Sequence, residues 1–166
     1  MHQRLFFAAL LSGMMAVPSA QAQDENAPVY RFKTLADLTA TSVKDQCRTG
    51  TCWSFSTTSF LESEAARLSG QVVDLSEMAS VRYTYPLKAD MYLRHHGLHQ
   101  FGPGSLCHDV LNAAAGYGLV PEFAFTGLDA GEAQFNHGEF DAVLAAAVKA
   151  MSEQKVLSDD WRDAVN

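Results

Sequence analysis

Apolar residues recur at helical spacing along most of the chain after residue 50 and predict a mainly helical protein. The run Cys52–Leu68 predicts one helix, with Gly70 just beyond its end. A second stripe ends at Gly118 and consists of Leu106, Val110, Ala113, Ala114 and Tyr117. A third predicts an amphipathic helix facing a core and consists of Phe140, Val143, Leu144, Ala147, Val148 and Met151.

Shorter signals place two further helices and a last helix start. Ser76 is a good N-cap for a helix running to about Tyr85, and Pro86 is expected to stop it because proline has no N–H to donate. Residues 88–98 predict another helical stretch. The segment 158–161 predicts the capped start of a final helix at Trp161.

The helix that starts at Cys52 has an unusual composition. Residues 54–59 are mostly Ser and Thr, and small side chains let neighbouring backbones approach closely, so we expect the central and mostly buried helix here. Glu62, Glu64 and Arg67 are expected on its wetter side. Because residues at i and i+2 do not face each other on a helix, Glu62 and Glu64 do not predict an acid–base pair.

Two segments have no helical pattern. Residues 23–42 predict either a short strand or a segment lying on the core. Residues 101–105 are dense in Gly and Pro and predict a loop whose bare backbone can approach a ligand, the alternative being a simple connector.

Residues 1–22 predict a secretory signal peptide. Arg4 supplies the positive start, Leu5–Val17 an apolar core, and Ala20-Gln21-Ala22 a cleavage site of small residues. An uncleaved anchor is the alternative, but this apolar run is too short to span a bilayer. We therefore expect a secreted or periplasmic protein, cleaved after Ala22 and then free of the membrane.

The composition of the remaining residues, 23–166, is typical of one globular domain. Without residues 1–22 the chain carries 11 Lys plus Arg against 19 Asp plus Glu, a net formal charge of −8. Phosphate binding needs clustered cations, so we expect no nucleic-acid partner.

The three cysteines predict no disulfide framework. The sequence does not decide whether Cys47 and Cys107 form a disulfide. Cys107 lies on a predicted helix and is expected to be packed.

The segment 46–53 carries the strongest candidate chemistry. Cys52 begins a helix after a loop made supple by Gly50. The free N–H groups and positive dipole end of a helix favour the thiolate, which is the attacking form in nucleophilic catalysis. The side-chain amide of Gln46 and the backbone N–H of Cys52 are suited to hold the oxyanion of a tetrahedral intermediate.

The register Q-x-x-x-G-x-C-W in this segment resembles the papain-like cysteine peptidases. The resemblance runs from about Val43 to the end of the chain, through the segments 75–77, 102–105 and 117–122. It is nearest to the bleomycin hydrolase and aminopeptidase C branch, especially its secreted bacterial members. Thr49 stands where the family has an additional cysteine, and Gly102 stands near the position of its bridging partner.

The resemblance implies an α+β papain-like fold, of which this chain holds mainly the helical, predominantly α lobe. It also implies a peptidase, with aminopeptidase the expected activity, that acts on peptide substrates without a cofactor. Cys52 would be the nucleophile and Gln46 the oxyanion donor. The substrate-binding positions that it implies are Gly50, Trp53, Gly104 and Ser105.

The family's catalytic His and Asn lie about 130–150 residues after the nucleophile, whereas 114 residues follow Cys52 here. We therefore expect an N-terminal portion without the β-rich lobe, with an apolar lobe face exposed. Branch members assemble into rings, so a homo-oligomer is possible. The alternative is a non-catalytic peptide-binding lobe or an inactive, truncated relic.

The remaining histidines predict little chemistry. His95 and His99 have the i, i+4 spacing of a ligand pair, but no second pair exists and a polar helix face is the simpler interpretation, so no metal site is predicted. His108 and Asp109 are adjacent on a helix and are expected to point too far apart for a triad. His137 is not expected to be the general base.

Overall fold

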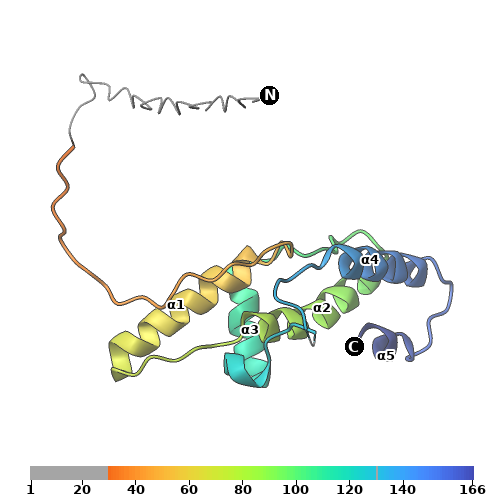
Figure 1. The fold of residues 1–166 in the computed structure, drawn as a ribbon. Helices are drawn as coiled ribbons and strands as arrows, with labels where there is room; N and C mark the ends of the chain where they lie inside the picture. Colours follow the sequence, from red (N-terminus) through yellow and green to blue (C-terminus); the bar gives the residue numbers. More distant parts are fainter. Residues whose placement is uncertain (1–29, 130) are drawn as a thin grey trace, which may run out of the picture. The chain divides into compact units, whose positions relative to one another are not determined.

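The computed structural model describes residues 30–129 and 131–166 (Figure 1). The chain divides into two units, Met1–Leu35 and Ala36–Asn166, and residues 30–35 are the described part of the first. The predicted signal peptide and its cleavage site after Ala22 lie outside the described residues. None of the described helices combines the length and apolar character needed to cross a membrane.

The second unit is built from helices. They are α1 Cys52–Ser69, α2 Glu77–Arg94, α3 Cys107–Tyr117, the 3-10 helix η1 Glu122–Ala124, α4 Gly138–Ser152 and α5 Trp161–Val165. Extended pairing within residues 30–129 and 131–166 is confined to two isolated bridges, Arg48 with Asn136 and Leu75 with Pro121. The predominantly helical character is therefore confirmed and fits the predicted helical lobe.

Helix α1 is buried on one face only. Its bounds confirm the prediction, and Gly70 closes it in the left-handed conformation with φ +72°. The buried face carries Trp53, Ser54, Thr57, Thr58 and Glu62. Phe60 is 62% exposed, so the expectation of a mostly buried helix was too strong. The expectation that Glu62 is solvated is wrong, because its exposed fraction is 0%.

Helix α2 is one helix rather than the two predicted, and it continues through Pro86. Ser76 caps it as expected, its Oγ accepting from the Ala79 N–H at 3.0 Å. Tyr85 and Ala89 on either side of the proline are buried in two different apolar clusters. Packing of this kind offsets the ~3 kcal/mol that a proline costs inside a helix.

Helix α2, not α1, is the central helix, because it contacts each of the other four α-helices (Figure 1). One cluster joins α1, α2 and α3 and contains Trp53, Met78, Val81, Tyr85 and Val110. The other joins α2, α4 and α5 and contains Ala89, Val148 and Val165. On α4 only Val148 is buried, so much of its predicted apolar stripe remains exposed.

The remaining predictions of local structure meet mixed outcomes. Residues 30–40 form no strand and their side chains are exposed. Helix α2 ends at Arg94 and His96 has φ +51°, so His95 and His99 do not share a helix face. Within the described ranges, no group of three or more His, Cys, Asp or Glu side chains is arranged to hold a metal ion.

Candidate active site

Cys52 lies at the protein surface as the first residue of α1. Its thiol is free, as are those of Cys47 and Cys107, so a Cys47–Cys107 bridge does not form. Cys107 is exposed rather than packed, contrary to expectation. The first turn of α1 carries no acidic residue. The positive end of the α1 dipole therefore acts on Cys52 without a competing negative charge on the same turn.

Two threonine hydroxyls close the loop that precedes Cys52. Thr49 Oγ1 donates to the Gln46 carbonyl at 2.9 Å, and the two hydroxyls of Thr49 and Thr51 lie 2.6 Å apart. Since the Thr49 proton is used on Gln46, the Thr51 hydroxyl donates to Thr49. Both threonines are almost fully buried. Thr49, which stands in place of the family's extra cysteine, thus ties Gln46 to the start of α1 by hydrogen bonds.

The Gly-rich loop 101–105 packs directly against the loop 46–51 that precedes Cys52, the cysteine loop. The Trp53 indole N–H donates to the Pro103 carbonyl at 2.9 Å. Gly50 has φ +65°, and a Cβ added there would lie 3.0 Å from Pro103 Cγ. Glycine is therefore required at position 50 both by the backbone conformation and by this close approach.

Lys88 holds the Gly-rich loop from α2. Its ammonium donates to the carbonyls of Gly102 and Gly104, the second at 2.6 Å. Burial lowers the pKa of Lys88, partly offset by Asp109 and Asp141. Together with Trp53, Lys88 binds three successive carbonyls, so this loop is held in place against the start of α1.

A third segment joins the cysteine loop through its backbone. The Arg48 N–H donates to the Phe135 carbonyl at 3.2 Å, and the His137 N–H donates to the Arg48 carbonyl at 3.0 Å. Burial lowers the pKa of His137, although Asp141 opposes this. Its Nδ1 is buried and has no hydrogen-bond partner in the described part of the chain. The sequence carries no signal for this pairing, because it runs through main-chain atoms.

Residues 31–83 match the family model of the papain family cysteine proteases. The match supports a papain-like cysteine peptidase. The matched stretch is less than half of the chain and includes Gln46, Gly50, Cys52 and Trp53. No curated protein matches the chain.

The predicted residues of the papain-like site lie in the loop 46–51, at the start of α1 and in the adjoining loop 101–105. Gly50 and Gly104 are exposed, whereas Trp53 is only 5% exposed and uses its indole N–H on Pro103. Ser105 is half-buried and donates to the Asp109 carboxylate. Their predicted contacts with substrate stay predictions, as do the roles of Cys52 and Gln46.

His108 and Asp109 approach each other more closely than expected. His108 Nε2 lies 3.5 Å from Asp109 Oδ1, so adjacency on α3 does not keep the two side chains apart. The other oxygen of Asp109 accepts from Ser105. No hydrogen bond or ion pair of the described residues links His108 to the loop 46–51.

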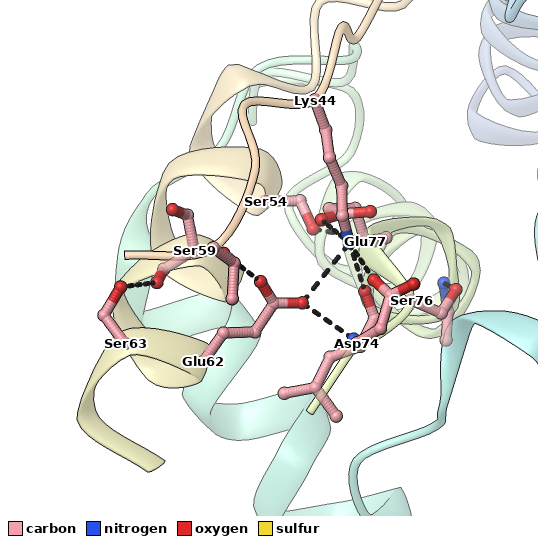
Figure 2. Close-up of polar contacts among 11 residues, drawn as sticks. Lys44, Ser54, Ser59, Glu62, Ser63, Asp74, Ser76 and Glu77 are labelled. Carbon is pink, nitrogen blue, oxygen red and sulfur yellow. Dashed lines mark hydrogen bonds and ion pairs between the residues drawn. The ribbon is translucent and has the colours of Figure 1, made fainter. Parts of the chain in front are cut away.

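A partly buried charge network around Lys44, Glu62, Asp74 and Glu77 was missed in the sequence (Figure 2). Lys44 Nζ contacts the carboxylates of Glu62 at 3.3 Å, Asp74 at 2.6 Å and Glu77 at 3.0 Å. Burial lowers the pKa of Lys44, but the bonds to Asp74 and Glu77 more than reverse this and leave it raised. Burial raises the pKa of Glu77, and burial followed by repulsion from Glu77 raises the pKa of Glu122 to about 7.

Proposed function

We propose that this chain is part of an exported papain-like cysteine peptidase that hydrolyses peptide bonds. The observation that carries the proposal is the free, exposed thiol of Cys52 at the start of α1, inside the segment that matches the papain family. Cys52 Sγ attacks the peptide carbonyl carbon. The carbonyl oxygen then takes N–H bonds from the Cys52 backbone and the Gln46 amide.

The remaining steps conserve atoms and protons. An imidazole takes the proton of the Cys52 thiol when the sulfur attacks. The tetrahedral intermediate then collapses, the C–N bond breaks, and the imidazolium gives this proton to the leaving amine. Water then attacks the acyl-Cys52 thioester, releases the acid product and restores the thiol. The chain requires no cofactor for this chemistry.

Gln46 has surroundings that support its proposed role. Its Oε1 is buried and accepts no hydrogen bond from the described residues, although its main-chain carbonyl is held by Thr49. Unsatisfied buried polar atoms are uncommon and call for a specific explanation, such as a catalytic site. With its oxygen unpaired, the Gln46 amide is not tied to another group of the described residues through Oε1.

The general base is proposed to come from a β-rich lobe that the resemblance implies and that is not among the described residues. His108 has no bond to the cysteine loop, and the buried Nδ1 of His137 is turned away from solvent. Exposed apolar residues offer surface for such a lobe or for a second copy of the chain. They include Phe60 on α1, Leu106 and Leu111 at α3, and Phe140 and Val143 on α4.

Finer features of the proposal rest on sequence alone. Removal of the amino-terminal residue of a peptide follows from the branch resemblance, and export follows from residues 1–22. A peptide-binding lobe without catalysis is the second candidate. The specific observation in its favour is that none of the described histidine side chains bonds to the loop 46–51.

Acylation by an activated peptide ester tests the proposal without requiring the general base. The full chain is mixed with dipeptide p-nitrophenyl esters, and the acylated residue is located by peptide mass. We expect one acyl group on Cys52, none on Cys52→Ser, and faster reaction for a free than for a blocked amino terminus. Equal acylation of all three cysteines would contradict the peptidase proposal, and ester binding without acylation would favour the second candidate.

A further inference from the structure

We propose that Glu62, acting with Lys44, is a positioning residue that holds the oxyanion donor Gln46 in register with Cys52. This inference rests on the proposed function of Cys52 and Gln46. Glu62 lies ten residues after Cys52 on the same helix and reaches no substrate itself. Its effect would pass through the segment 41–46.

Glu62 uses both of its carboxylate oxygens on segments outside its own helix. Oε2 accepts from Thr41 Oγ1 at 2.5 Å, and Oε1 accepts from the Leu75 N–H at 2.7 Å and from Lys44 Nζ at 3.3 Å. Figure 2 shows Lys44 extending into this network toward Glu62, Asp74 and Glu77. A fully buried carboxylate with three donors is a rigid attachment point, since releasing any donor leaves charge or N–H groups unpaired.

The segment that Glu62 holds is the one that carries Gln46. Residues 41–46 form no helix or strand, so regular secondary structure does not position this segment. Lys44 lies two residues before Gln46, a span of at most ~7 Å of backbone. Its ammonium is bound to Glu62 and also donates to the Leu75 carbonyl at 3.2 Å. Fixing Lys44 therefore restricts where Gln46 can lie.

Both oxyanion donors are in this way attached to the same helix, α1. The Cys52 N–H belongs to α1 directly, and Gln46 is tied to α1 at one end through Glu62 and at the other through Thr49. Ten helical residues span ~15 Å without a flexible joint. Because misplacement of ~1 Å in a catalytic group is enough to cost orders of magnitude in rate, such bracing has a catalytic consequence.

Two reagents, applied to the full chain, distinguish an effect on the position of Gln46 from a general loss of stability. A dipeptide aldehyde adds the Cys52 thiol to its carbonyl, and the resulting hemithioacetal oxygen needs the Gln46 donor. Iodoacetamide alkylates the same thiol by displacement and forms no oxyanion. We expect Glu62→Gln to weaken aldehyde binding roughly tenfold, a partial loss of one oxyanion donor, while Cys52 alkylation stays within about twofold.

Matched variants make each outcome decisive. Glu64→Gln, on the same helix and paired with Arg67, should change neither aldehyde binding nor the rate of Cys52 alkylation. If Glu62→Gln does not fold, Thr41→Val, which removes one hydrogen bond of the network, should still weaken the aldehyde more than it slows alkylation. Unchanged aldehyde binding, or proportional loss of both readings, would overturn the inference. A wild-type chain that forms no Cys52 aldehyde adduct would instead refute the proposed function, before any variant is made.

Discussion

Two helices of this protein begin with a cysteine, and their surroundings differ sharply. Cys52 begins α1 and Cys107 begins α3; both thiols are free and exposed. The residue before Cys52 is Thr51, fully buried in a hydroxyl pair, whereas Leu106 before Cys107 is 63% exposed. The first turn of α3 carries Asp109, and that of α1 carries no acid.

If the proposed function is correct, a helix start alone does not make a nucleophile. Both cysteines meet the same backbone N–H groups and dipole. Cys52 differs in the hydrogen bonds that fix its surroundings. Thr49 bonds to Gln46, Trp53 bonds to Pro103, and Glu62 bonds to the segment 41–46. We expect the α1 start to be rigid and reactive, and the α3 start to be neither.

The largest expected effect comes from removing the buried carboxylate on the α1 side. Glu62→Leu leaves the Leu75 N–H without its partner and removes one of the three carboxylates around Lys44. Loss of one member of a buried pair costs at most about 3–5 kcal/mol. Urea unfolding measures this change. Glu64→Leu, two residues away and solvated, should leave the midpoint unchanged; an equal loss in both variants would show that the network does not brace α1.

The glycines that precede the two helices should respond differently. Gly50→Ala meets both a left-handed φ and Pro103 at 3.0 Å, so we expect a loss of about 1–3 kcal/mol. Gly104→Ala meets nothing within 4 Å and should cost less than about 0.5 kcal/mol. The two thermal unfolding midpoints give the comparison, and similar values would mean that the cysteine loop is not tightly packed.

The charge network should make stability depend on pH. The pKa of Glu122 rises from 4.5 to about 7, chiefly through burial and repulsion from Glu77, with Asp74, Glu62 and Lys44 also facing it. The folded chain therefore holds a proton that the unfolded chain releases, so this contribution is full below pH 4.5 and is lost as pH rises through 7. Since Glu122 is only partly buried and solvent screens the charges around it, we expect on the order of 1 kcal/mol.

Substitution of that carboxyl tests the pH dependence. Glu122→Gln should flatten the decline in unfolding free energy between pH 5 and 7, as followed by urea titration at a series of pH values. Glu139→Gln, an exposed carboxylate on α4, is the control and should keep the wild-type slope. A Glu122→Gln profile parallel to that of wild type would rule out this group as the source.

The smallest expected effect is on the α3 side. Asp109→Asn removes the negative charge from the first turn of α3, and charge at a helix start is worth about 0.3–1 kcal/mol. Alkylation of Cys107 should therefore quicken roughly two- to fivefold. The Cys52 rate in the same sample is the internal control and should not change.

Local features of the fold were predictable and long-range ones were not. The start of α1 at Cys52 and its end at Gly70 follow from neighbouring residues, as does the Ser76 cap. The passage of α2 through Pro86 depends on Tyr85 and Ala89 packing into separate clusters, which no local pattern reveals.

The same limit applies to the site. Gln46 and Cys52 could be proposed from the sequence because their spacing along the chain is itself the signal, and their roles stay predictions. The burial of Glu62 depends on Thr41, Lys44 and Leu75, which approach it from outside its helix. The pattern along the helix therefore placed Glu62 wrongly on the wetter side. The clamp of Lys88 on the Gly-rich loop is likewise a contact with main-chain carbonyls and leaves no trace in residue type.

The most direct test of the nucleophile assignment compares the cysteines of the intact chain in one tube. The protein is treated with limiting iodoacetamide at mildly acidic pH, and the label at Cys47, Cys52 and Cys107 is quantified by peptide mass over time. Our account predicts that Cys52 reacts at least roughly tenfold faster than Cys107. Equal rates at the two helix starts would contradict it, because the bracing around α1 would then have no chemical consequence.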